Sequence, residues 1–383
     1  MNSPAPARER LVALDVFRGM TIAGMLLVND PGTWSAIYPP LEHAEWNGWT
    51  PTDLIFPFFL FIAGVTTHLS LSSRRAQGAD EREIVRQIVR RGAVIVLLGL
   101  LVNAVPFYPL TRFTHIRIPG VLQRIGLAYT CAALLTLRGS LKRQVVILVT
   151  LLYGYWFAMT LLPVPGAMGG IGANLLGAPS RTLAAWLDRL LLDGHLWVNS
   201  KTWDPEGPLS TIPAIGTAML GVFAGRWLAE KRPLVERLNG LFAVGALGMT
   251  FGLMWNWSFP INKSLWTSSY VLFTAGMACV AIATISWIID VRGVTRWAKP
   301  LVIYGVNPIV AFVGSGVMAR LIYSLWKVDF RGNPTAVQAV VYETVFHSWL
   351  DPRNASLAFA VSFVLFWYLV LWILWRRNIL LKV

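Results

Sequence analysis

Apolar stretches long enough to cross a bilayer recur along this chain, and they constrain its fold more than any other feature. A spanning helix needs about 20 residues, and a search with a window of about 19 residues finds ten such stretches. Hydrophobic residues make up 55% of the chain and charged residues 14%, against roughly 25% charged in soluble domains. We therefore predict an all-α, polytopic integral membrane protein. The expected spans lie near residues 11–30, 52–73, 92–108, 119–137, 144–162, 212–230, 238–257, 268–289, 300–322 and 355–375.

The ten stretches leave no room for a separate soluble module, so we predict a single transmembrane domain, residues 1–383. The first ten residues, MNSPAPARER, do not resemble a cleavable signal peptide, and we expect the first span to be a retained signal anchor. Cys131 and Cys279 both lie in apolar stretches and are expected to be core residues. The sequence shows no metal-ligand spacing, and we predict no metal site.

Basic residues divide unevenly between the two sets of connecting segments. If the N-terminus is cytoplasmic, 21 of the 33 Lys and Arg residues lie on the inner side and nine on the outer side. The remaining three, Arg18, Arg124 and Arg320, lie within spans. The positive-inside rule therefore predicts that both termini are cytoplasmic. It also accounts for much of the net charge of +14, so nucleic-acid binding is not expected.

This orientation places the long connections outside, at residues 31–51, 163–211, 258–267 and 323–354. These segments hold most of the Trp, Asn, Pro and acidic residues outside the spans, whereas the inner connections are short and basic. A polar substrate would therefore be recognised on the extracytoplasmic face.

The segment HAEWNGWTPTD, residues 43–53, leads into the second span and carries the strongest candidate for catalysis. Thr50 is a predicted N-cap, and Asp53 lies at the third helical position, where a carboxylate suits the helix dipole. The positive end of this helix would disfavour a charged imidazole at His43, and a neutral imidazole is a usable general base. Two structural alternatives remain open: His43 as an interfacial histidine among tryptophans, and Asp53 as a helix cap only.

Ionisable residues inside the spans also favour a functional site. Asp15 and Arg18 lie three residues apart on one face of the first span, and Arg124 lies in the fourth. Charges at such depth usually face a cavity or a partner. The alternative for the first two is a structural ion pair. Asn29 ends the first span close to the loop that carries His43.

Several long motifs resemble the heparan-α-glucosaminide N-acetyltransferase family and its bacterial relatives. They are LVALDVFRGMTIAGMLLVND, HAEWNGWTPTDLIFPFFLFIAG, IRIPGVLQRIGLAY, DPEGPLSTIPAIGTAMLG, PINKSLWTSSYVLFTAG and YGVNPIVAF, in the family's order from about residue 11 to beyond 310. The resemblance implies a polytopic homodimer that moves an acetyl group from acetyl-CoA to the amine of a glucosamine across the membrane. It also implies that His43 is the active-site histidine and that Asn29 matches the family's asparagine.

The chain departs from the lysosomal pattern in two places. It begins without a long luminal domain, and it has Asp30 and the longer stretch DPGTWSAIYPPLE before His43. We therefore expect an amino-sugar acceptor other than heparan sulfate, and a location in a bacterial inner membrane.

The chemistry that the resemblance implies assigns roles to the polar residues. His43 would accept the proton of the amine, with Asp53 the next candidate for a base, and the Asn29 amide would donate to the developing oxyanion. The cations expected to meet the phosphates of coenzyme A are Arg18, Arg124 and Lys263. The expected sugar contacts are Trp46, Asn47, Asp204, Glu206 and Asn262.

Three questions stay open at this stage. Acetyl transfer could be direct or could pass through an acetyl-histidine. The end of the bundle that holds the nucleotide of coenzyme A is not fixed. Charges within membrane spans are also typical of a sugar or ion transporter, which is the main alternative function, and a non-catalytic scaffold is a further one.

Overall fold

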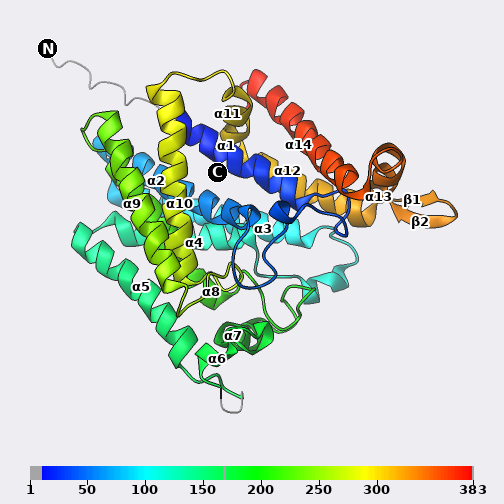
Figure 1. Ribbon diagram of the computed structural model, residues 1–383, viewed down its shortest axis with the longest axis horizontal. Helices are drawn as coiled ribbons and strands as arrows, with labels where there is room; N and C mark the ends of the chain where they lie inside the picture. Colours follow the sequence, from blue (N-terminus) through cyan, green and yellow to red (C-terminus); the bar gives the residue numbers. More distant parts are fainter. Residues whose placement is uncertain (1–10, 167–169, 382–383) are drawn as a thin grey trace.

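Long helices dominate the computed structural model, which describes residues 11–166 and 170–381 (Figure 1). Within these residues, eight helices are long and apolar enough to cross a membrane, which confirms the predicted all-α fold of a polytopic membrane protein. The eight are α1 (Val12–Asn29), α2 (Ile55–Ala76), α5 (Leu141–Leu161), α8 (Pro208–Leu228), α9 (Leu234–Trp255), α10 (Ser268–Ser286), α12 (Pro308–Arg320) and α14 (Pro352–Arg376), some with a short 3-10 or π turn attached. The predicted anchor's N-terminal flank, with Arg8 and Arg10, and Lys382 lie outside the described residues.

Shorter elements complete the bundle. The remaining α-helices are α3 (Glu81–Ala104), α4 (Val121–Leu137), α6 (Gly172–Leu175), α7 (Leu183–Leu192), α11 (Lys299–Val306) and α13 (Val337–Val341). The 3-10 turns are Pro39–Leu41, Pro51–Leu54, Leu110–His115 and Pro179–Arg181, and the π turns are Trp287–Val291, Leu321–Leu325 and Tyr342–Phe346. Strands β1 (Lys327–Phe330) and β2 (Asn333–Ala336) form an antiparallel hairpin that projects from one end of the molecule (Figure 1).

Two helices differ in extent from the stretches read off the sequence. The stretch near 92–108 belongs to α3, which begins at Glu81. The first turns of α3 are charged, so a search for apolar residues starts the span too late. The stretch near 300–322 is broken at Asn307, which has φ −123° and ψ 56°. Pro308 follows it, and a residue before proline is disfavoured in the α conformation. The side chain of Asn307 donates to Ile379 O (3.0 Å) and accepts from Leu381 N (3.0 Å), which ties the break to the C-terminal segment.

Helices α2 and α8 pack backbone to backbone where they cross. A Cβ at Gly64 would lie 2.1 Å from Ala218 O, and a Cβ at Gly221 would lie 2.1 Å from Phe61 O. Only glycine fits at both positions, and such small residues let membrane helices pack backbone to backbone. This contact fixes α2, which directly follows the 3-10 turn that carries Asp53.

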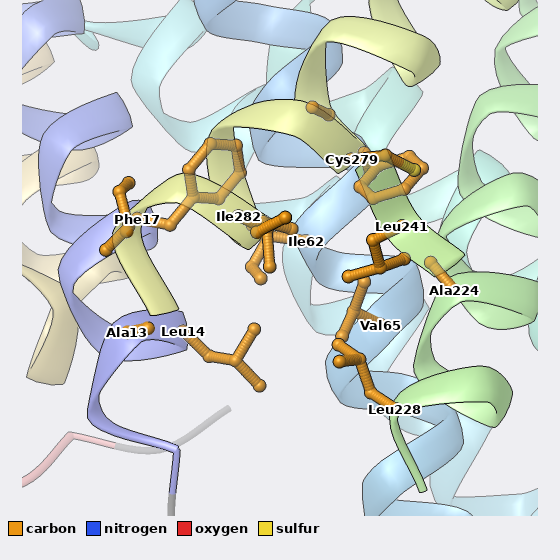
Figure 2. Packing of buried hydrophobic residues seen from close by; sticks show 14 of the residues in the cluster. Ala13, Leu14, Phe17, Ile62, Val65, Ala224, Leu228, Leu241, Cys279 and Ile282 are labelled. Carbon is orange, nitrogen blue, oxygen red and sulfur yellow. The ribbon is translucent and has the colours of Figure 1, made fainter. Parts of the chain in front are cut away.

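The central apolar core joins helices that are distant in the sequence. Phe17 of α1 packs with Ile62 of α2 and Ile282 of α10, and Leu241 of α9 closes the cluster from the other side (Figure 2). Each of these side chains is buried. The core holds α1 and α2 side by side, so that the end of α1 and the start of α2 meet at the same end of the bundle.

Candidate active site

A capping box at the start of α2 positions the candidate catalytic pair. Thr50 is the cap residue of the 3-10 turn Pro51–Leu54, and Asp53 returns the bond by accepting from Thr50 N at 3.0 Å. The same oxygen of Asp53 accepts from Ala44 N at 3.0 Å. Two backbone donors therefore fix the carboxylate, and they also hold the loop that contains His43.

The other oxygen of Asp53 faces the histidine. His43 Nδ1 lies 2.7 Å from Asp53 Oδ1; the Asp53 side chain is 1% exposed and that of His43 is 46% exposed. With the carboxylate as acceptor, Nδ1 carries the proton and Nε2 keeps its lone pair. The helix-cap role and the role beside His43 are therefore combined in one carboxylate. From the sequence, only the positive end of the helix was expected to act on His43; the structure adds the buried carboxylate of Asp53 beside the imidazole.

Lys263 brings an ammonium group to the same place. Its Nζ lies 3.0 Å from Nδ1 and 3.1 Å from Nε2 of His43, and 3.6 Å from Asp53 Oδ1. Burial lowers the pKa of Lys263, and the charge of Asp53 opposes that shift. His43, Asp53 and Lys263 thus form one polar cluster, with the lysine on the connection between α9 and α10.

A cavity of about 480 Å³ opens beside this cluster. Its mouth is polar, with His43, Lys263, Glu206 and Asn29, while its deeper walls come from α1, α2, α4 and α12. Thr21 and Asn29 both line it and lie eight residues apart on α1, which corresponds to about 12 Å of depth. The deeper lining is mostly apolar: Ile22, Met25, Ile55, Phe56, Phe59, Ile125 and Phe312.

Arg117, which was not expected from the sequence to be a site residue, lines the cavity and binds Asp204 and Glu206. Arg117 Nε donates to Asp204 Oδ2 at 2.8 Å, and its Nη2 bonds to Asp204 Oδ1 at 2.6 Å and to Glu206. Burial alone would lower the pKa of Arg117, but the two carboxylates outweigh it and raise the pKa. Asp204 is fully buried by this pairing, whereas Glu206 lines the cavity.

Tryptophans form the wall next to Glu206. Trp46 packs edge-on against Trp203, with ring centroids 5.3 Å apart, and Trp203 packs against Trp197 at 5.9 Å. All three line the cavity. Trp46 was expected from the sequence to contact the sugar. Trp197 and Trp203 were not, because they lie more than 150 residues from Trp46 and only the fold brings them to the same wall.

Asn47 and Asn262 do not line the cavity but hold its loops together. Asn262 Nδ2 donates to Asn47 Oδ1 at 3.1 Å, and Asn262 Oδ1 accepts from Leu265 N at 2.8 Å. Asn262 is completely buried. The pair joins the His43 loop to the Lys263 loop and thereby sets the distance between those two side chains.

The structure places Arg18 and Arg124 away from the described lining of the cavity. Arg18 pairs with Asp15 on the same helix. Arg124 is 1% exposed, bonds to Ser210 and lies over the Trp266 ring at 5.1 Å. Of the three cations expected to meet the phosphates of coenzyme A, only Lys263 is at the cavity.

The family model described as "Heparan-alpha-glucosaminide N-acetyltransferase, catalytic" matches residues 10–249, which is more than half of the chain. The chain belongs to this family. The matched region contains Asn29, His43, Asp53 and Glu206, whereas Lys263 lies beyond its end.

Curated relatives extend the similarity over most of the chain. Human heparan-alpha-glucosaminide N-acetyltransferase (Homo sapiens) is 30% identical over an alignment 431 residues long, with 98% of this chain and 60% of the human protein covered. The mouse protein (Mus musculus) of the same description is 32% identical over 371 residues, with 84% of this chain and 55% of the mouse protein covered. The chain therefore spans about 60% or less of the length of these N-acetyltransferases.

Proposed function

We propose that this protein is a membrane N-acetyltransferase that moves the acetyl group of acetyl-CoA to the amine of an extracytoplasmic amino sugar. One observation carries the proposal: in a chain of this family, His43 is paired with a buried carboxylate at 2.7 Å and lies at the mouth of a deep cavity. A fixed base beside a cavity is the arrangement that acyl transfer to an amine requires.

His43 acts as the general base in this proposal. The amine nitrogen forms a bond to the thioester carbonyl carbon and gives its proton to Nε2, while Asp53 holds the proton on Nδ1 and stabilises the imidazolium. The C–S bond then breaks, and the proton on Nε2 is available to the leaving thiolate. His43 ends the cycle neutral. A base of this kind contributes about 10²–10⁴-fold to the rate.

Lys263 indicates where the amine binds. Its primary ammonium group lies 3.1 Å from His43 Nε2 and 3.6 Å from Asp53 Oδ1. The chemical environment there already accommodates a primary amine, so the amino group of the sugar would take this position and displace the lysine. Lys263, once displaced, remains near enough to face the carbonyl oxygen of the donor.

The rest of the cavity divides into a sugar site and a donor site. Glu206 offers a carboxylate to sugar hydroxyls, and the Trp46 and Trp203 rings offer apolar faces to the sugar ring. Asn29 is exposed at the cavity and could donate its amide to the oxygen that gains charge. The apolar lower part suits the pantetheine arm of the donor, which supplies the activated acetyl group.

We further propose that the protein is a homodimer in a bacterial inner membrane, with both termini cytoplasmic. The uneven distribution of Lys and Arg supports this orientation. A cysteine at Ser35, in a background with Cys131 and Cys279 replaced by alanine, should react with a membrane-impermeant reagent in intact cells. A cysteine at Ser73 should react only after lysis, and the reverse pattern would invert the orientation.

The function is tested with purified protein in liposomes, acetyl-CoA and a panel of amino sugars. We expect consumption of the thioester together with an N-acetylated sugar. Counterflow of unmodified sugar without thioester consumption would instead identify a transporter and overturn the proposal.

A further inference from the structure

A second cavity, of about 460 Å³, lies between α2, α3 and α4 at the end of the bundle opposite His43. Asp53 lies in the turn before α2 and Arg74 in the last turn of α2; they are 21 residues apart, which corresponds to about 31 Å of helix. This length matches the hydrocarbon core of a bilayer, about 30 Å thick. A ligand in this cavity would therefore be a membrane thickness away from the candidate active site.

The rim of this cavity is basic. Arg74 of α2 and Arg90 and Arg91 of α3 line it, together with one acidic residue, Glu83. In the part of the chain that the structure describes, none of the three arginines contacts a carboxylate, whereas nearby Arg138 is paired with Glu81. Arg91 instead lies over the Tyr129 ring at 5.0 Å, which fixes one guanidinium at the rim.

Gln87 lines the same cavity and carries one buried polar atom. Gln87 donates its amide Nε2 to Glu83 Oε1 at 2.7 Å, while its Oε1 is buried and accepts no hydrogen bond from the described residues. A buried acceptor without a donor is costly. A ligand hydroxyl that reached Gln87 Oε1 from this cavity would supply the donor.

An apolar track leads away from the rim along α3. Arg90, Val94, Leu97 and Leu101 recur at the spacing of one helix face, and Leu97 and Leu101 are 57% and 51% exposed. From Arg90 to Leu101 the helix rises about 16 Å, which is about half the thickness of the hydrocarbon core. The track has the length of one leaflet, and hence of one acyl chain.

From these features we propose that the cavity between α2, α3 and α4 binds an anionic phospholipid with a hydroxyl-bearing headgroup, such as phosphatidylglycerol. Arg74 and Arg90 bind the phosphate, Gln87 accepts from a headgroup hydroxyl, and an acyl chain lies along Val94, Leu97 and Leu101. Basic pockets between membrane helices bind anionic headgroups by the same chemistry. The proposal is independent of the function assigned to the His43 site.

The test uses the full chain in detergent, with lipid binding measured by native mass spectrometry. Arg90→Gln is compared with Arg86→Gln, which removes the same charge one turn earlier on α3 from an exposed residue outside this cavity lining. Because one basic contact near a membrane surface contributes about 1 kcal/mol, we expect phosphatidylglycerol to bind about fivefold more weakly to Arg90→Gln and unchanged to Arg86→Gln. Arg74→Gln with Arg90→Gln should lower binding further.

Three competitors distinguish the source of the phosphate. Phosphatidylcholine, inorganic phosphate and coenzyme A should each fail to displace phosphatidylglycerol at equal concentration. Displacement by inorganic phosphate would identify a simple anion site, and displacement by coenzyme A would identify a nucleotide site. Binding of phosphatidylcholine as strong as that of phosphatidylglycerol would show that the lipid's charge plays no role. Each of these three outcomes would overturn the proposal. Equal affinity of wild-type protein and Arg90→Gln would do so as well.

Gln87→Leu tests the headgroup hydroxyl separately. The wild-type protein should prefer phosphatidylglycerol over phosphatidic acid, which has no headgroup hydroxyl beyond its phosphate. Gln87→Leu should lose that preference while retaining its affinity for phosphatidic acid. A preference that survives the substitution would contradict the role of Gln87, and melting temperatures of all variants show whether the fold is intact.

Discussion

His43 Nδ1 and Asp53 Oδ1 lie 2.7 Å apart, and the same aspartate caps the helix that follows. One buried carboxylate therefore connects the backbone of the His43 loop, the start of α2 and the imidazole ring. This relationship makes the geometry of the proposed base depend on how α2 begins. It also means that catalysis and local stability can be separated only by choosing substitutions that change one and not the other.

His43→Ala should lower acetyl transfer by about 10²–10⁴-fold, which is the contribution of a positioned general base. Binding of coenzyme A should persist, because the histidine acts on the amine. His347→Ala is the matched control, since His347 is paired with Glu343 on the hairpin side of the molecule. Near-normal turnover of His43→Ala at saturating acceptor would leave His43 as an interfacial histidine.

The same variant also separates the two routes of transfer. Direct transfer predicts that acetyl-CoA without acceptor leaves the enzyme unmodified. An acetyl-histidine route predicts that acetylated enzyme can be trapped under these conditions, together with ping-pong kinetics. Mass spectrometry of the wild-type protein, with His43→Ala as the blank, reads out this difference, and we expect no acetylated enzyme.

Asp53→Asn should mainly lower the turnover number, because the amide is uncharged and no longer stabilises the imidazolium. Thr50→Ala is its control: it removes the hydroxyl of the cap and leaves the contact between Asp53 and His43 in place. Loss of a cap typically costs about 1 kcal/mol. Thermal melting and turnover measured together should show the control weakened mainly in stability; equal turnover in both variants would argue that Asp53 is only a cap.

Much of this arrangement is predictable from local sequence, and the rest is not. The long apolar stretches predict the helices, and TPTD predicts the cap because both signals depend on residues within one or two turns. The contact of Lys263 with His43 joins residues 220 positions apart, and Arg117 contacts Asp204 across 87 positions. Such contacts arise from helix packing, so the sequence could name Lys263 as a cation but could not place it beside the histidine. Arg124 shows the opposite case, since its depth in a span suggested a ligand contact and the structure buries it against Trp266.

Asp204→Asn and Glu206→Gln should have different effects although both residues bind Arg117. The Asp204 side chain is fully buried, and breaking a buried ion pair costs about 3–5 kcal/mol, so Asp204→Asn should mainly lower the melting temperature. Glu206 lines the cavity. Glu206→Gln should raise KM for the amino sugar about tenfold, the loss expected for a hydrogen bond to a charged group, while KM for acetyl-CoA stays constant. A change confined to acetyl-CoA would place Glu206 on the donor side.

Asp188 of α7 should make the stability of the protein fall as the pH rises from about 4 to 7. Burial raises its pKa from 3.8 to about 7, an effect that the charge of Asp204 increases, although Asp204 N donates a hydrogen bond to it. Because the folded pKa is the higher one, the folded state binds more protons than the unfolded state in this interval, and stability declines with pH. The decline has a limit of about 1.4 kcal/mol per pH unit for one group and ends above the folded pKa.

Asp188→Asn removes this titration and should therefore gain stability relative to the wild-type protein as the pH rises from 5 to 7.5. Asp193→Asn, at the exposed residue directly after α7, should keep a constant difference from the wild type over the same range. Melting temperatures of the three proteins in one detergent, measured at half-unit intervals of pH, give the two differences directly. If the difference for Asp188→Asn were constant, Asp188 would already be ionised in the fold at pH 5, and the acidic cluster beside Arg117 would carry one more negative charge than its burial suggests.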